Sequence, residues 1–289
     1  MPHRALIKHR PWLLASLVAG ISYFFVSDAP IGGAWLMLWK GAGVGFLAIY
    51  ASFRTRGLDG LLIALALTLC ALGDVTLEIS FLIGGGFFAA GHALAITLYL
   101  RNRRATSTGS QKLVGASLLL ITPLIAALLT YPVENWQVAA VYSGVVGAMA
   151  AAAWTSRFPR YQVGSGAVLF VVSDLIIFAR EGGAVPDLVG DWLIWPLYYG
   201  GQFLIATGVV QTLRSDRGLT VNQLFSNLLT QGGIDESRYV FFRQFSRGPV
   251  QRGPLHDPRS PKGGIKRCSS KPSDVPPPPA TPAFVQPPT

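Results

Sequence analysis

Apolar stretches long enough to cross a membrane follow one another along most of this chain. Of its 289 residues, 51% are hydrophobic and only 13% are charged, which is typical of integral membrane proteins. A spanning helix needs roughly 20 apolar residues. Eight stretches are candidates, the first of them short: residues 12–26, 31–53, 58–78, 81–100, 113–130, 136–155, 163–179 and 191–211. The sequence therefore predicts an all-α, polytopic membrane bundle of eight transmembrane helices.

The charged residues between these stretches predict on which side of the membrane each loop lies. The N-terminus and alternate loops are basic, whereas Arg180 is the one basic residue in the intervening, mainly acidic loops. Because Lys and Arg are retained on the cytoplasmic side, we expect both termini in the cytoplasm, as an even number of helices requires. The basic residues concerned are Arg4, Lys8, Arg10, Arg54, Arg56, Arg101, Arg103, Arg104, Lys112, Arg157, Arg160, Arg214 and Arg217. We expect the membrane to be a bacterial inner membrane.

From Asp216 onward the composition changes to Ser, Pro, Gly and Arg, with four consecutive prolines at 276–279. Such a segment buries too little apolar surface to fold alone. We therefore expect a transmembrane domain at 1–215 and a disordered cytoplasmic tail at 216–289. A short surface helix at 221–229 and a Pro-rich partner ligand are alternatives for parts of the tail. The net charge of +10 belongs mainly to the tail and loops, so it does not indicate nucleic-acid binding.

Two aspartates, Asp74 and Asp174, lie inside the apolar stretches. A carboxylate in hydrocarbon costs several kcal/mol, and such groups normally face the bundle interior or water and pair with one another. With a rise of 1.5 Å per residue, other polar side chains lie in the same layer, between the outer interface and the midplane. They are Lys40, His92, Tyr199 and Gln202. This shared depth predicts one polar cavity formed by several helices.

Each supporting residue also has a structural explanation. Lys40 would neutralise an aspartate in an ion pair, and His92 would be a hydrogen-bonded core histidine. Ser173, which precedes Asp174, would bond back to its own helix. Tyr199 and Gln202, three apart on one helix, would hold two helices together. The residues alone leave these alternatives open.

The sequence gives little indication of a metal or cofactor site. Cys70 lies in an apolar stretch and Cys268 in the tail, which suggests neither a disulfide framework nor a metal cluster. His92 and the two aspartates would bind a metal only if three helices brought them together, and their spacing gives no support for this. Phosphate-binding loops, nucleophile elbows and paired-histidine zinc motifs are missing from the sequence. We therefore expect no metal and no cofactor.

Four short motifs occur in order along the chain. They are Gly73-Asp74, Phe87 followed by His92, Leu169-Phe170 followed by Ser173-Asp174, and Tyr198-Tyr199 followed by Gln202. In this order they resemble the YhhN family of eight-helix membrane proteins, whose animal members are lysoplasmalogenases. The resemblance spans most of residues 31–212. Lys40 matches a family lysine that proline commonly follows, whereas Gly41 follows it here.

The resemblance implies hydrolysis of the vinyl ether bond of a lysoplasmalogen-like lipid to a fatty aldehyde and a glycerophospho-head group. By analogy with glycoside hydrolysis, one carboxyl of Asp74 and Asp174 would be the acid and the other would stabilise the cation and activate water. Lys40 beside one aspartate would divide these roles, but the sequence does not decide which aspartate is the acid. His92, Tyr199, Gln202 and Ser173 would bind substrate or water. A membrane lipid is the expected partner.

Two other functions fit the same residues. Buried Asp, Lys and His side chains also mark proton relays, so a proton-coupled transporter of a small molecule or lipid is the main alternative. A noncatalytic lipid-binding or sensing protein is the third possibility. The natural substrate, its head group and chain length, and the oligomeric state do not follow from the sequence.

Overall fold

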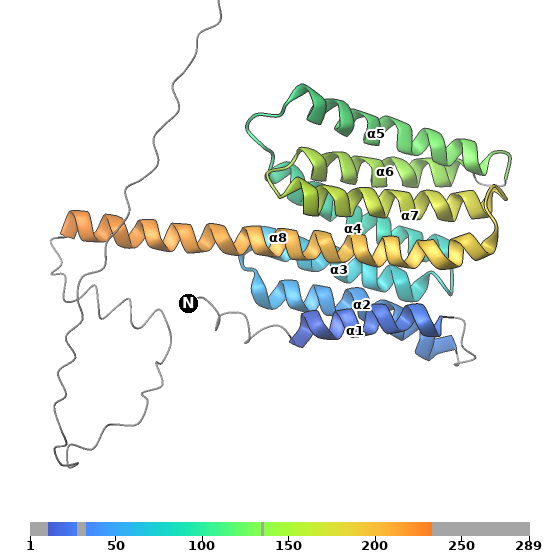
Figure 1. Ribbon diagram of the computed structural model, residues 1–289, viewed down its shortest axis with the longest axis horizontal. Coiled ribbons are helices and arrows are strands. Elements are labelled where there is room, and N and C mark those ends of the chain that lie inside the picture. The colour runs from blue at the N-terminus through green and yellow to red at the C-terminus, as the bar shows by residue number, and fades with distance from the viewer. Residues whose placement is uncertain (1–10, 28–32, 134–135, 233–289) are drawn as a thin grey trace, which may run out of the picture. The chain divides into compact units, whose positions relative to one another are not determined.

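The computed structural model describes residues 11–27, 33–133 and 136–232, with side chains as far as residue 218. Within these residues it consists of eight α-helices and a short π-helix, without a strand. The elements are α1 (Pro11–Val26), α2 (Gly33–Arg54), α3 (Gly57–Thr76), α4 (Phe81–Arg101), α5 (Gly109–Thr130), α6 (Trp136–Thr155), η1 (Arg160–Gly164), α7 (Ser165–Glu181) and α8 (Asp187–Gly232). The helices run alternately up and down the bundle (Figure 1). The predicted all-α bundle is confirmed.

The helices have the length and composition expected of membrane spans. In the described part of the chain, seven are long and apolar enough to cross a membrane, and α1 is a shorter apolar helix of 16 residues. Large hydrophobic side chains such as Phe25, Trp35, Val141 and Leu128 are exposed on the surface of the bundle. A surface this apolar indicates contact with lipid rather than water. The protein is therefore a multi-pass membrane protein.

The last helix is much longer than its apolar stretch. The sequence predicts a span at 191–211, whereas α8 runs for 46 residues, from Asp187 to Gly232. A hydropathy pattern reports only how far the apolar residues extend, whereas a helix continues until its backbone hydrogen bonding is broken. Proline breaks this bonding, and the first proline after Pro196 is Pro249. Residues 216–232, which the sequence assigns to the tail, are thus helical. The rest of the predicted tail lies outside the described residues.

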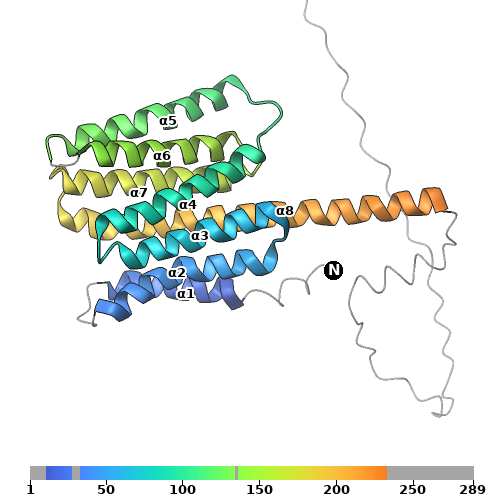
Figure 2. The same ribbon diagram turned by 180° about the vertical axis from the view of Figure 1, so that it is seen from behind.

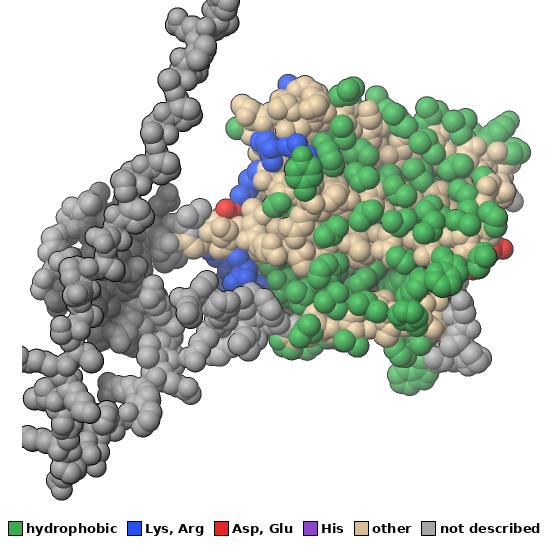
Figure 3. Space-filling model, in the orientation of Figure 1, with side chains coloured by type: hydrophobic (Ala, Val, Ile, Leu, Met, Phe, Trp, Pro, Cys, Tyr) green, Lys and Arg blue, Asp and Glu red, His purple; other side chains and the backbone are tan. Residues whose placement is uncertain are grey.

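Basic side chains gather at one end of the bundle (Figure 3). This is the end at which α2, α4 and α6 finish. Ion pairs join neighbouring elements there, with Arg101 Nε 3.1 Å from Asp59 Oδ1 and Arg157 Nη1 2.6 Å from Asp216 Oδ2. By the positive-inside rule, we expect this end to face the cytoplasm. We call it the basic end and the opposite end the outer end.

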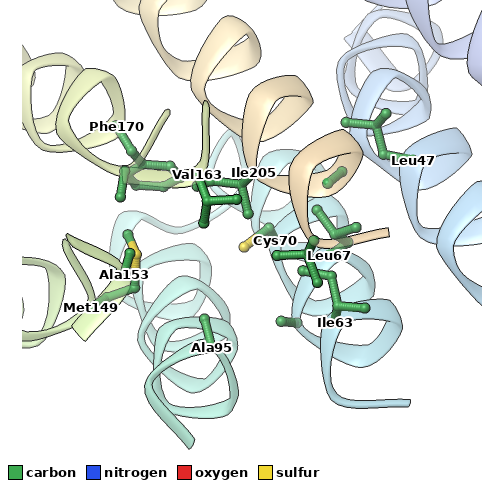
Figure 4. Packing of buried hydrophobic residues seen from close by; sticks show 14 of the residues in the cluster. Leu47, Ile63, Leu67, Cys70, Ala95, Met149, Ala153, Val163, Phe170 and Ile205 are labelled. Atoms are coloured by element: carbon green, nitrogen blue, oxygen red, sulfur yellow. The ribbon is translucent and has the colours of Figure 1, made fainter. Parts of the chain in front are cut away.

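Apolar residues fill the middle and the basic half of the bundle. Figure 4 shows residues of one apolar cluster that come from several helices: Leu47 from α2, Ile63, Leu67 and Cys70 from α3, Ala95 from α4, Met149 and Ala153 from α6, Val163 from η1, Phe170 from α7 and Ile205 from α8. Small residues allow the helices to approach closely where lipid provides no hydrophobic drive. The larger open space lies nearer the outer end, where the two aspartates lie.

Candidate active site

A cavity of about 480 Å³ lies in the outer half of the bundle, a size usual for small-molecule sites. Six helices, α2, α3, α4, α6, α7 and α8, contribute to its wall. Most of the lining is apolar and aromatic, including Phe88, Phe170 and Trp195. The polar side chains in the lining are Lys40, Asp74, Gln137, Tyr142, Ser173, Asp174 and Tyr198. Asp74 and Asp174, a hundred residues apart in sequence, therefore share one cavity.

Asp74 is held near the outer end of α3 and is only 2% exposed. Its Oδ2 accepts a hydrogen bond of 2.8 Å from the hydroxyl of Tyr198 on α8. The preceding Gly73 lets α4 come close, because a Cβ at this position would lie 2.8 Å from the ring of Phe88. A buried carboxyl needs such a partner, since an unsatisfied one would bear the full cost of desolvation.

Asp174 lies on α7 in a matching environment and is 7% exposed. Its Oδ2 accepts a hydrogen bond of 3.2 Å from the hydroxyl of Tyr142 on α6. The neighbouring Ser173 donates to the carbonyl of Phe170 at 2.7 Å, the back-bond that the sequence offered as an alternative. Each aspartate is thus hydrogen-bonded by a tyrosine from another helix. The sequence analysis assigned neither tyrosine to the site, although each lies within a predicted span and Tyr198 belongs to one of the four motifs.

Lys40 lines the cavity and pairs with Glu78 rather than with an aspartate. Its Nζ lies 2.5 Å from Glu78 Oε1, and the Lys40 side chain is 16% exposed against 48% for Glu78. The ammonium group also lies within electrostatic range of Asp74. The sequence-based alternative in which Lys40 forms an ion pair with an aspartate is thus wrong, because Lys40 pairs with Glu78.

His92 and Gln202 lie one layer deeper than the aspartates. Both are buried and line a small void of about 20 Å³, together with Cys70 and Tyr99. The His92 ring packs edge-on against Phe170, with 4.7 Å between the ring centres. Its Nε2 has no hydrogen-bond partner among the described residues. These two predicted supporting residues therefore line the small void and not the large cavity, and Phe170 lines both.

Tyr199 points away from the cavity. Its hydroxyl is 2.8 Å from Ser16 Oγ on α1, and its ring lies where a Cβ on Gly20 would be. Successive residues of a helix are about 100° apart around its axis, so the two adjacent tyrosines face different neighbours. The structure places Tyr198, not Tyr199, in the cavity. Within the described residues, no three His, Cys, Asp or Glu side chains come together as metal ligands would.

Comparison with known proteins gives one family. The sequence model of the YhhN family matches residues 35–209. The chain is 30% identical over 217 residues to the lysoplasmalogenase TMEM86A of Bos taurus. The aligned region covers 70% of this chain and 83% of the relative. The same values hold for lysoplasmalogenase TMEM86A of Homo sapiens. No solved structure matches. The matched residues include the helices that carry Lys40, Asp74 and Asp174, and the chain belongs to the YhhN family.

Proposed function

We propose that this protein hydrolyses the vinyl ether bond of a lysoplasmalogen-like lyso-ether lipid within the membrane. The observation that carries this proposal is the pair of buried aspartates, Asp74 and Asp174, which line one apolar cavity in a lipid-facing bundle. The two relatives named as lysoplasmalogenases support the same reaction class. The predicted bacterial inner membrane stays a prediction, because both of these relatives are animal proteins.

The reaction needs a proton delivered to carbon. A carboxylic acid protonates the vinyl carbon remote from the ether oxygen, and the double-bond electrons form the new C–H bond. The adjacent carbon becomes an oxocarbenium ion, which water attacks while a carboxylate accepts the proton of that water. The resulting hemiacetal then breaks its bond to the glycerol oxygen, which takes up a proton from the carboxylic acid, while the hemiacetal hydroxyl gives its proton to the other, ionised carboxylate and becomes the aldehyde carbonyl. The products are a fatty aldehyde and a glycerophospho-head group. Two carboxyl groups in different protonation states are sufficient for each step.

We assign the acid to Asp174 and the ionised carboxylate to Asp74. The polar groups that interact with Asp174 are Tyr142 and Ser173, which are both neutral. Asp74, in contrast, lies within range of the Lys40 ammonium, which favours a negative charge. Asp74 is then suited to stabilise the oxocarbenium ion and to accept a proton from water. This division follows the rule that different surroundings assign acid and base roles to paired carboxyls.

The surroundings of the aspartates suit a single-chain lipid. The aromatic and aliphatic wall offers contact to the hydrocarbon chain and keeps bulk water from the cation. Lys40 at the outer side of the cavity is the group that would contact a phosphate, since ammonium groups bind phosphate oxygens well. The cavity is backed by packed core residues toward the basic end. The transporter alternative would need that core to open.

The first test measures aldehyde released from a lysoplasmenyl-ethanolamine by the purified protein in detergent. Asp174→Asn and Asp74→Asn keep the size of the side chain but remove its acid–base capacity. Each is expected to lower the rate by about 100-fold or more, the usual contribution of a general acid or base. Asp187→Asn is the matched control, because Asp187 is exposed at the start of α8 and should leave the rate unchanged. Near-full activity of both cavity variants would contradict the mechanism.

A second measurement tests the chemistry itself. In D₂O, protonation of the vinyl carbon places one deuterium on the carbon next to the aldehyde group of the product. Mass spectrometry of the trapped aldehyde detects this label. An aldehyde formed without it would point to another cleavage route. Lipid transfer across proteoliposomes without any aldehyde would favour the transporter instead.

A further inference from the structure

The cavity that holds the aspartates extends to the lipid-facing surface. Residues of its wall on α4 and α6 are among the most exposed apolar side chains, with Leu82 and Val141 both 72% exposed. At the other extreme, Asp74 and Asp174 are almost fully buried. One continuous apolar wall thus connects the surface of the bundle with the carboxyl groups.

The opening lies where α4 and α6 diverge. At the basic end the two helices are joined, because Arg157 donates from its backbone N to the Asn102 carbonyl at 2.9 Å and from its Nε to Asn102 Oδ1 at 2.7 Å. Figure 2 shows α4 crossing the bundle obliquely, so that its outer end lies beside α3. The first turns of α4 and α6 are therefore separated, and residues from both line the cavity there.

Glycines form the α4 side of this opening. A Cβ on Gly84 would lie 2.6 Å from the backbone of Leu77, so Gly84 serves the packing of α4 on α3. Gly85 and Gly86 differ, because a Cβ on either would meet nothing within 4 Å, although both line the cavity. Packing does not require glycine at these two positions. Their missing side chains leave the passage into the cavity open.

We propose that the hydrocarbon chain of a single-chain phospholipid enters the cavity sideways from the bilayer through this opening. The lateral opening is defined by Leu82, Gly85, Gly86, Val138 and Val141. Its rim is apolar and faces lipid, whereas the ion pair of Lys40 and Glu78 joins α2 to the loop that follows α3. A lipid of the outer leaflet would thus keep its head group at the interface while its chain passes between α4 and α6. The choice of lipid rests on the proposed function.

The test is photolabelling of the full-length protein in detergent–lipid micelles. The probe is a saturated 1-O-alkyl lysophosphatidylethanolamine with a diazirine midway along its chain, which the proposed reaction does not cleave. We expect labelling of peptides from the first turns of α4 and α6, and displacement of the probe by unlabelled alkyl lyso-lipid. Gly86→Leu fills the opening and should lower the displaceable labelling about tenfold, as expected for a pocket that loses room for its ligand.

Gly144→Leu is the matched control. Gly144 is a helical glycine on α6 whose Cβ would also meet nothing within 4 Å, but it does not line the cavity. This variant should label like the wild type, and both variants should keep the wild-type midpoint of thermal unfolding. Labelling that Gly86→Leu leaves unchanged, or that competitor does not displace, would overturn the proposal. Because labelling needs no turnover, a wild type that labels but releases no aldehyde would refute the proposed function and leave the lateral opening intact.

Discussion

At the scale of single residues, two adjacent tyrosines on α8 have different environments. The Tyr198 hydroxyl donates to Asp74 in the cavity at 2.8 Å. The Tyr199 hydroxyl instead contacts Ser16, which in turn donates to the Gly43 carbonyl at 2.6 Å and so joins α1, α2 and α8. The first tyrosine bonds to a carboxylate that we propose to be catalytic, and the second holds helices together.

This difference predicts that replacing tyrosine by phenylalanine lowers the reaction rate at one position and the stability of the fold at the other. Tyr198→Phe removes the hydrogen bond to Asp74 and is expected to lower aldehyde release about tenfold or more, because one hydrogen bond to a charged group contributes roughly 1.5–3 kcal/mol. Tyr199→Phe is expected to lower the free energy of unfolding by about 1 kcal/mol with little effect on the rate. Initial rates and unfolding in detergent check both values. A larger loss of rate in Tyr199→Phe would contradict the placement of the two side chains.

At the scale of elements, direct backbone contact between α7 and α8 positions the site. A Cβ on Gly201 would lie 2.6 Å from the carbonyl oxygen of Gly166, and one on Gly166 would lie 2.8 Å from the carbonyl oxygen of Gly201. Such close approach is characteristic of small residues at membrane helix interfaces. Gly201 is about one turn from Tyr198, so this contact sets the separation between α7, with Asp174, and the tyrosine that binds Asp74.

Neighbouring glycines again allow a matched comparison. Gly201→Ala forces α7 and α8 apart and is expected to destabilise the protein by about 1–3 kcal/mol, as overpacking usually does. Gly200→Ala meets nothing within 4 Å and should leave stability unchanged or slightly higher, since Ala favours a helix by up to about 1 kcal/mol over Gly. Thermal unfolding of the two variants measures the difference. Equal stability would mean that the backbones are not in contact at Gly201.

At the scale of the whole described bundle, the cavity with the two aspartates and the basic side chains lie toward opposite ends. Arg and Lys side chains gather where α2, α4 and α6 finish, whereas the cavity lies toward the outer end (Figure 3). If the basic end faces the cytoplasm, the aspartates lie in the outer half of the membrane. The lipid pool that supplies the site is then the outer leaflet.

Labelling of single cysteines in intact cells tests this orientation. Ala184→Cys and Ala105→Cys place thiols at exposed positions in loops at the outer end and the basic end. In a chain with Cys268→Ser, and with Cys70 buried in the core, a membrane-impermeant maleimide should label the first variant only. Permeabilised cells should label both. The reverse pattern in intact cells would move the site to the cytoplasmic leaflet and contradict the predicted topology.

The sequence alone determined the fold class, the alternation of the helices and the common depth of the two aspartates, whereas His92 and Gln202 lie one layer deeper than it predicts. Apolar stretches of membrane length predict spans, charged loops predict their direction, and a rise of 1.5 Å per residue places Asp74 and Asp174 in one layer. The helix ends were less predictable: α8 continues to Gly232 because hydropathy reports where lipid contact ends and not where helical hydrogen bonding ends.

The tertiary structure alone decided which side chains face one another. In a soluble protein a polar helix face marks the exterior, but in lipid both the core and the outer surface are apolar, so composition does not identify the inward face. For this reason the sequence put Tyr199 in the cavity instead of Tyr198, missed Tyr142, and did not reveal Glu78 as the partner of Lys40. Depth along a helix follows from residue number, whereas direction around its axis depends on the neighbouring helices.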